Sequence, residues 1–219
     1  MPRPYRRWAS EAVYHLTVRG NNRQPIFLDA GDHRQYLLTL HHCRQKWPYR
    51  LLAFALMPNH VHLVIQTLPG ASPSKAMQWL NAVYTRYFNE RHQRVGHLYQ
   101  GRFYSNQVER DMHLFEVTRY VHLNPVRARL VAQPLEYPWS SYRIYLGLEQ
   151  DPWHLVDSTP ILQLFGDTPA VQVEAYRRFV EELVLEERAR EVWVRRLRTH
   201  RLIPPLRWLR EEKSVRHFS

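Results

Sequence analysis

Two histidines separated by a single residue are the first candidates for chemistry in this sequence. The triplet His60-Val61-His62 follows Pro58 and Asn59, a turn sequence, and opens an apolar run typical of a β-strand. Side chains at positions i and i+2 of a strand leave the same face, roughly 7 Å apart at the backbone. Both imidazoles can therefore converge on one cation while Val61 faces the core. Because the chain holds 13 histidines, a chance pair of surface or core histidines is the alternative interpretation.

A tyrosine and an asparagine one helical turn apart form the second pair of candidates. Tyr120 and Asn124 lie in a segment whose apolar residues have helical spacing, so they share one helix face. The amide oxygen of Asn124 could be the third ligand of a cation held by His60 and His62, with the Tyr120 hydroxyl beside a metal-bound phosphate. Two imidazoles, an amide oxygen and water suit Mg²⁺ or Mn²⁺ better than a structural zinc. The alternative is a packing tyrosine, which is the common role of this residue on a helix.

The charge of the chain indicates the class of partner. A formal net charge of +11 and a pI near 10.1 predict a polyanionic partner, nucleic acid before membrane. The 31 basic residues include only three lysines, and the other 28 are arginines, which bind phosphate in two-point geometry and stack on bases. A GC-rich genome would also explain the excess of arginine over lysine, but it would not explain the net charge.

The N-terminal segment combines basic and aromatic residues. Arg3, Arg6 and Arg7 alternate with Tyr5 and Trp8, a combination that suits single-stranded DNA because bases stack on aromatic rings. A solvated charged surface is the alternative. The first twenty residues contain no long apolar stretch, so we expect neither a signal peptide nor a membrane helix, and we expect a cytoplasmic protein.

Hydrophobic periodicity and turn residues predict the elements that must position these side chains. We expect strands over residues 12–18, 50–56, 61–67 and 103–109, and helices over 29–47, 72–96 and 111–124. The last helix is expected to end near Asn124, because a proline such as Pro125 disfavours the helical conformation in the residue before it. This order predicts an α+β fold, a ferredoxin-like antiparallel sheet with two helices on one face and an additional helix that carries Tyr120.

The composition changes after residue 147. Proline-containing loops and a long helical pattern over residues 172–198 follow, and the last segment is rich in arginine. We therefore predict a domain over residues 1–147 and a mainly helical, basic C-terminal extension over 148–219. The extension could pack on the sheet, form a dimer contact or add affinity for DNA, and its arginines favour DNA. The single cysteine, Cys43, excludes an intramolecular disulfide.

Five runs of sequence resemble the single-tyrosine transposases of the HUH type, and they follow one another along the chain in the order typical of that family. The resemblance is strongest to the REP-associated branch, which is linked to repeated extragenic palindromes. Residues 56–64 resemble the histidine–hydrophobic–histidine signature, and residues 119–127 resemble the tyrosine helix. Further similar runs cover residues 14–21, 96–103 and 137–142. The resemblance extends over about residues 1–147.

The resemblance implies a mechanism that uses the residues already singled out. His60, His62 and Asn124 would bind a divalent ion, Mg²⁺ or Mn²⁺, and Tyr120 would attack the phosphate, giving a 5′-phosphotyrosine and a free 3′-hydroxyl. The partner would be a single-stranded DNA hairpin, a REP palindrome, with an adjacent guide sequence, and the resemblance implies a bacterial protein associated with the nucleoid. DNA contacts are expected from Arg19, from Arg102 in a glycine-flanked segment, and from the N-terminal arm; a monomer and a homodimer both remain open.

Two other functions compete with this one. A domesticated relative could bind hairpins tightly without cutting them. A metal-dependent nuclease could instead activate water and release a free 5′-phosphate with no protein–DNA adduct. The joint presence of two histidines, a tyrosine and an asparagine favours the tyrosine transposase.

Overall fold

The computed structural model describes residues 8–108 and 111–199, and it divides into two compact units. The first unit extends through Val180, and the second begins at Glu181 within the last helix. The strands are β1 (Val13–Arg19), β2 (Tyr49–Met57), β3 (His60–Thr67) and β4 (Tyr104–Val108). The α-helices are α1 (Ala30–Lys46), α2 (Pro73–Arg91), α3 (Asp111–Arg127), α4 (Tyr142–Tyr145), α5 (Thr159–Leu162) and α6 (Pro169–Thr199). Short 3-10 turns are η1 (Asn21–Arg23), η2 (Pro134–Glu136) and η3 (Gln163–Phe165).

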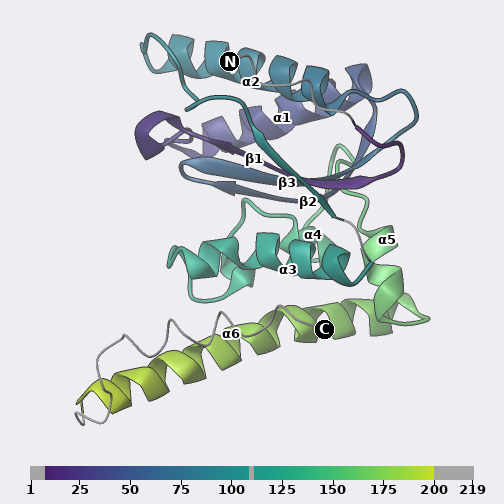
Figure 1. Ribbon diagram of the computed structural model, residues 1–219, viewed down its shortest axis with the longest axis vertical. Helices are drawn as coiled ribbons and strands as arrows, with labels where there is room; N and C mark the ends of the chain where they lie inside the picture. Colours follow the sequence, from purple (N-terminus) through teal and green to yellow (C-terminus); the bar gives the residue numbers. More distant parts are fainter. Residues whose placement is uncertain (1–7, 109–110, 200–219) are drawn as a thin grey trace, which may run out of the picture. The chain divides into compact units, whose positions relative to one another are not determined.

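The four strands form one antiparallel sheet in the order β2-β3-β1-β4. Helices α1 and α2 cover one face of this sheet, and α3 lies on the other face, against β2 and β3 (Figure 1). The predicted ferredoxin-like fold with an additional tyrosine-bearing helix is therefore confirmed. None of the helices in the described part of the chain has the length and apolar character that a membrane span needs.

Alternation along β1 separates the core from the opposite face. Tyr14, Leu16 and Val18 are buried among the residues that pack against α1 and α2, whereas His15 and Thr17, between them, belong to the other face. The same rule holds in β3, where Val61, Leu63 and Ile65 enter the core. The predicted inward orientation of Val61 is confirmed by its complete burial.

A buried carboxylate joins the start of α1 to the end of α2. Asp29 caps α1 by accepting the Asp32 backbone N–H at 3.1 Å, at the start of the helix predicted over residues 29–47. Asp32 itself is fully buried and accepts the Leu28 backbone N–H at 2.8 Å and Arg91 Nη1 at 2.7 Å. His92 Nε2 lies 3.0 Å from the same carboxylate. These contacts satisfy a charge that would otherwise be costly to bury.

The predicted end of the tyrosine helix was wrong. Helix α3 continues through Pro125 to Arg127 instead of ending near Asn124. Proline removes one backbone hydrogen bond, but the next turn is still closed, because the Ala128 N–H donates to the Asn124 carbonyl at 2.8 Å. The loss is limited because the helix ends within one turn of the proline.

Residues 137–157 close the outer edge of β2. The Ser141 N–H donates to the Phe54 carbonyl at 3.0 Å, and the Tyr137 hydroxyl donates to the Leu56 carbonyl at 2.7 Å. An exposed strand edge invites pairing with other chains. This segment therefore protects the strand next to the one that carries the two histidines.

Packing continues past the predicted domain boundary at residue 147. Val156 forms a parallel bridge with Leu51 of β2, and the adjacent Leu155 is 2% exposed. The first compact unit accordingly includes residues up to Val180. A functional domain ending at residue 147 stays a prediction.

Candidate active site

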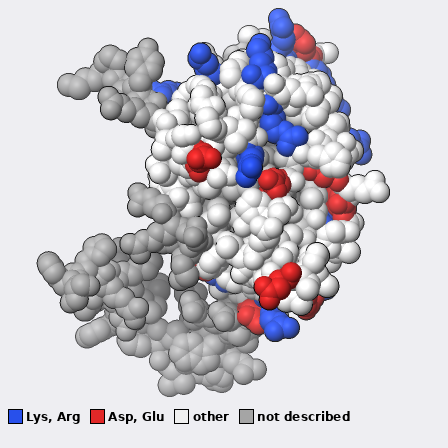
Figure 2. Space-filling model, turned by 90° about the vertical axis from the view of Figure 1, so that its right-hand side faces the viewer, with Lys and Arg blue, Asp and Glu red and all other residues white. Residues whose placement is uncertain are grey.

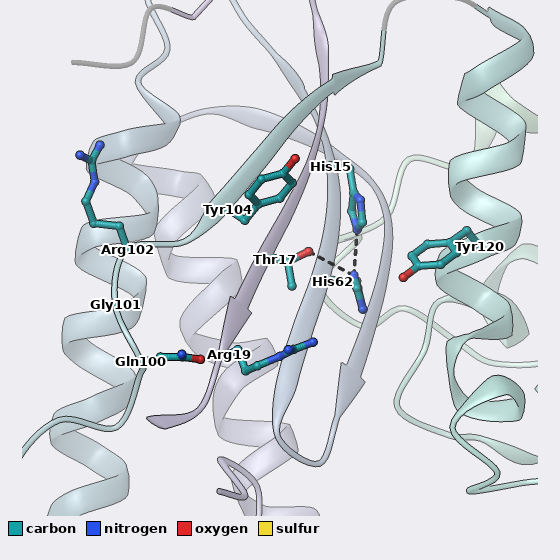
Figure 3. A pocket seen from close by; sticks show the side chains of 9 residues that line it. All are labelled: His15, Thr17, Arg19, His62, Gln100, Gly101, Arg102, Tyr104 and Tyr120. Atoms are coloured by element: carbon teal, nitrogen blue, oxygen red, sulfur yellow. Dashed lines mark hydrogen bonds between the residues drawn. The ribbon is translucent and has the colours of Figure 1, made fainter. Parts of the chain in front are cut away.

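Polar side chains from two neighbouring strands gather on the face of the sheet that α3 covers. The antiparallel register places Thr17 of β1 opposite His62 of β3, and Arg19 opposite His60. Because alternate residues of a strand share a face, His15 joins Thr17 and Arg19 beside the two histidines. The close-up in Figure 3 shows His15 and Thr17 both directed at His62.

The contacts of His60 determine which of its ring nitrogens carries the proton. Its Nδ1 lies 2.7 Å from Oδ1 of Asn59. The Asn59 Nδ2 donates to the Arg23 carbonyl at 3.0 Å, which identifies the other end of the amide as the oxygen. Since an amide oxygen can only accept, the His60 Nδ1 donates, and Nε2 of the neutral ring holds the free lone pair.

His62 is the most enclosed of the histidines in this group. Its side chain is 5% exposed, and its Nδ1 lies 2.8 Å from His15 Nε2 and 3.3 Å from Thr17 Oγ1. Its Nε2 is buried and has no hydrogen-bond partner within the described part of the chain. The rings of His60 and His62 lie 4.8 Å apart between centroids. A buried nitrogen without a protein partner is a feature that calls for a ligand.

All three imidazoles of the site are neutral near pH 7. Burial lowers the pKa of His62 to about 2, with further lowering by the charges of His15, His60 and Arg19, and the Asn124 amide opposes this shift. Burial, and then the charge of Arg19, lowers the pKa of His60 to about 4. Burial alone lowers the pKa of His15 to about 4. Metal ligation requires neutral imidazole, so these rings need no deprotonation before binding a cation.

Helix α3 brings the predicted nucleophile to the histidines. The Tyr120 ring centroid lies 5.7 Å from that of His62 and 5.9 Å from that of His15. The Tyr120 side chain is 41% exposed, and Figure 3 shows its hydroxyl pointing toward His62. One turn later, the Asn124 Nδ2 donates to the Tyr120 carbonyl at 2.9 Å. The amide nitrogen is thereby used, which leaves the Asn124 oxygen available for a cation or for His62.

Side chains next to Tyr120 anchor α3 in the first unit. His122 is fully buried, with Nδ1 at 2.7 Å from the Tyr176 hydroxyl and Nε2 at 2.7 Å from Ser141 Oγ. The Arg119 guanidinium lies over the Phe179 ring, 4.0 Å from its centroid. These contacts fix the rotation of α3 about its own axis, and hence the direction in which Tyr120 points.

A pocket of about 570 Å³ opens beside Tyr120 and His62. It is lined by His15, Thr17, Arg19, His62, Gln100, Gly101, Arg102, Tyr104 and Tyr120. Of the predicted DNA contacts, Arg19 extends toward His62, whereas Arg102 lies on the far side and points away from the histidines (Figure 3). His60 and Asn124 adjoin His62 but do not line the pocket. Arg3, Tyr5, Arg6 and Arg7 lie outside the described residues.

Sequence reasoning missed His15, Thr17 and Tyr104 as members of the site. His15 and Thr17 do carry a signal, because they are polar residues two apart in an otherwise apolar strand. Tyr104 is 65% exposed on the pocket wall, at the start of β4. An exposed ring beside arginine is a surface on which a base can stack.

The donor atoms at the site have the chemistry of a divalent-cation site. No cluster of three or more His, Cys, Asp or Glu residues suited to a metal exists among the described residues. A cation here would instead meet Nε2 of His60, Nε2 of His62 and the Asn124 amide oxygen. Such a mixed set leaves coordination positions for water and phosphate oxygens and is compatible with Mg²⁺ or Mn²⁺. The observation that supports a cation here is the buried His62 Nε2, which has no hydrogen-bond partner among the described residues.

Positive charge extends well beyond this pocket. On the face shown in Figure 2, Lys and Arg side chains lie mainly in the upper half, toward α1 and α2, with acidic side chains among and below them. On this face the basic side chains are thus interspersed with acidic ones rather than gathered around one site. The formal net charge of +11 raises affinity for a polyanion without specifying where on the protein it binds.

Known proteins share both the sequence pattern and the architecture. A family model described as IS200-like transposase matches residues 9–124. A Haemophilus influenzae protein provisionally named a REP-associated tyrosine transposase is 27% identical over 180 residues, which are 74% of this chain and 98% of that protein. The structure of a REP-associated tyrosine transposase bound to a REP hairpin superposes with a TM-score of 0.58 at 17% identity, covering 73% of this chain and 94% of that one.

Proposed function

Because the chain belongs to the IS200-like transposase family, whose members cut and rejoin DNA, we propose that it nicks and rejoins single-stranded hairpin DNA with Tyr120 as the nucleophile. His60, His62 and Asn124 hold a divalent cation in this proposal. The observation that carries it is the proximity of the Tyr120 and His62 rings, 5.7 Å apart between centroids, at a pocket open to a substrate.

The reaction exchanges one ester for another. The Tyr120 oxygen attacks the scissile phosphorus, and the bond from phosphorus to the 3′-oxygen breaks. The phenol loses its proton, and the departing 3′-oxygen takes one up, so the products are a 5′-phosphotyrosine and a 3′-hydroxyl. Attack by the 3′-hydroxyl of another end reverses the steps and restores the phenol, so rejoining needs no ATP.

The residues of the site divide the remaining tasks. A bound divalent ion supplies polarisation of the scissile phosphate and neutralises its developing charge. His60 and His62 present neutral nitrogens to it, and the Asn124 oxygen comes from the same helix face as the attacking hydroxyl. Arg19 adds positive charge beside the histidines, where a phosphate would lie. Movement of α3 would therefore shift nucleophile and third ligand together.

The comparisons and the pocket support a proposal for the substrate class. A protein of similar fold is bound to a REP hairpin, and the basic charge of this chain suits DNA. We propose a REP-type hairpin with an adjacent single-stranded guide sequence as the substrate. The exposed Tyr104 ring offers a stacking surface for an unpaired base.

The test uses hairpin oligonucleotides from repeated palindromes of the host genome, labelled at the 3′-end. A 5′-phosphotyrosine attaches the labelled fragment to the protein, so the label should move with the protein on a denaturing gel in Mg²⁺ or Mn²⁺. Chelation of the metal should abolish the adduct. Tyr120→Phe should abolish it as well, because the attacking oxygen is gone.

Tyr137→Phe is the matched control for the loss of a tyrosine hydroxyl. It removes one hydrogen bond to the Leu56 carbonyl at the outer edge of β2, leaves the pocket-lining side chains unchanged, and should form adduct like the unaltered protein. Equal cutting by Tyr120→Phe would refute the nucleophile. A labelled fragment with a free 5′-phosphate and no adduct would identify a water-activating nuclease. Tight hairpin binding without cutting in any divalent ion would identify a non-catalytic binding protein.

A further inference from the structure

We propose that His15 is a positioning residue for the cation site: its Nε2 accepts the Nδ1–H of His62 and thereby keeps the lone pair of His62 on Nε2. The inference rests on the proposed function, since it assigns His62 Nε2 to a cation. It adds a residue from a different strand that is not itself a ligand of the cation. In this proposal His15 acts on cation binding through the orientation and tautomer of His62.

The relative position of the two rings is set by the sheet. His15 lies two residues before Thr17, the direct partner of His62 in the antiparallel register. The His15 Nε2 to His62 Nδ1 distance is 2.8 Å, and the two ring planes are inclined by 20°. Backbone ladders of β1 and β3 hold both Cα atoms, so the contact does not depend on a loop.

Metal ligation distinguishes the two proton arrangements of this pair. If His15 Nε2 donated to His62 Nδ1, the proton of His62 would reside on Nε2. A protonated ring nitrogen has no lone pair to offer a cation. If His62 Nδ1 donates instead, Nε2 carries a lone pair that a cation satisfies. The second arrangement is therefore the one that the site can use.

The companion histidine shows the same arrangement with an unambiguous acceptor. His60 donates from Nδ1 to the Asn59 amide oxygen, which cannot donate in return. Both ligands thus have Nδ1 engaged and Nε2 directed elsewhere. Ligand histidines commonly donate their second N–H to a neighbouring acceptor, and removal of that acceptor typically weakens metal binding about 10–100-fold.

Thr17 is the competing partner of the same nitrogen. Its Oγ1 lies at 3.3 Å from His62 Nδ1, longer than the 2.8 Å to His15. A hydroxyl and a neutral imidazole nitrogen can each donate or accept. The shorter distance is therefore the reason for which we assign the contact to His15.

The tautomer can be read in the metal-free protein. Long-range ¹⁵N spectra of histidine-labelled protein distinguish a protonated ring nitrogen from an unprotonated one, and His62→Ala assigns the signals. The expected result is a protonated Nδ1 and an unprotonated Nε2 on His62. A His62 protonated on Nε2 in the unaltered protein would overturn the proposal.

Binding of Mn²⁺ supplies a second readout that does not involve catalysis. Titration of the full chain, followed by the electron paramagnetic resonance of free Mn²⁺, should show about 10–100-fold weaker binding in His15→Ala. His15→Gln should recover part of the affinity, because its amide oxygen can accept the Nδ1–H. His42→Ala, which removes an exposed histidine of α1, is the matched control and should bind as the unaltered protein does.

The outcomes separate this inference from the proposed function. If His62→Ala abolishes Mn²⁺ binding while His15→Ala leaves it unchanged, His15 has no positioning role and the cation site stands. If the unaltered protein binds no Mn²⁺ above the level of His62→Ala, the cation site itself is wrong. If Thr17→Val weakens binding and His15→Ala does not, Thr17 is the partner and the assignment to His15 fails.

Discussion

Replacing His122 with leucine should destabilise the protein through lost polar contacts, although the apolar volume is largely kept. The imidazole bridges the Tyr176 hydroxyl and Ser141 Oγ, each at 2.7 Å, at a fully buried position. Each hydrogen bond contributes about 1 kcal/mol net, and a buried hydroxyl deprived of its partner costs about 1–3 kcal/mol. Ser141 retains the Phe54 N–H as a donor to its hydroxyl at 2.9 Å, and the Tyr176 hydroxyl retains the Thr118 side chain as a partner. The penalty at Tyr176 therefore lies at the lower end, about 1 kcal/mol, and together with two lost hydrogen bonds gives an expected loss of about 3 kcal/mol.

Thermal unfolding followed by circular dichroism measures this loss. About 3 kcal/mol corresponds to a decrease in Tm of about 10 °C for a domain of this size. Tyr176→Phe alone leaves His122 Nδ1 without its hydrogen-bond partner. The double variant Tyr176→Phe with His122→Leu should therefore lose less stability than the sum of the two single losses, by about 1–2 kcal/mol. Strictly additive losses, or a change below about 0.5 kcal/mol for His122→Leu, would refute the bridging role. His42→Leu, at an exposed position, should leave Tm nearly unchanged.

Three further results are expected. Asp32→Asn should lower the free energy of unfolding, measured by denaturant titration, by about 3 kcal/mol, because it removes the buried carboxylate that pairs with Arg91. Asp29→Asn keeps a good helix cap and should lower the same free energy by less than about 1 kcal/mol. Arg102→Ala should weaken hairpin binding, measured by fluorescence anisotropy, and should reduce the slope of log K against log salt concentration by about 1. Arg86→Ala, which loses only an exposed ion pair on α2, should change neither quantity. Equal effects of the two substitutions would argue against a specific contact by Arg102. Burial lowers the pKa of His122 to about 3, so its contribution to stability is complete above pH 6.5 and is lost as the pH falls; about 2 kcal/mol should disappear between pH 6.5 and pH 5, and a pH profile unchanged in His122→Leu would contradict this.

Periodicity was sufficient for most of the fold. Alternation in β1, the apolar run of β3, the Asp29 cap and the Pro58-Asn59 turn each act locally, so they could be recognised in a single sequence. The end of α3 could not, because the local preference against a helical residue before Pro125 was overridden by continued hydrogen bonding in the next turn. The closure of β2 was also invisible, since single hydroxyls such as that of Tyr137 cap its carbonyls without a strand-like pattern.

The candidate site was predictable only in part, for a related reason. The i,i+2 and i,i+4 spacings fix which side chains share a face within one element, and these spacings identified His60, His62, Tyr120 and Asn124. Their proximity to His15 depends on which strands are neighbours and on the register between them. Neither the strand order nor the register can be derived from a single sequence. Arg102, an expected DNA contact, does line the pocket, but its side chain is directed away from the histidines, which the sequence did not indicate. The roles of all these residues in cutting DNA stay predictions until the adduct is sought.

The pairing of β1 with β3 links folding to activity, because one register of the two strands is required for both. A slip of one residue would send His15, Thr17 and Arg19 into the apolar interior and bring Leu16 to the opposite face. The register that buries the apolar side chains of β1 is thus also the register that brings the polar side chains of the site together. A purified sample that melts in one cooperative transition should consequently contain no stable, inert, misaligned fraction, and the number of reactive tyrosines per chain should equal the fraction that is folded.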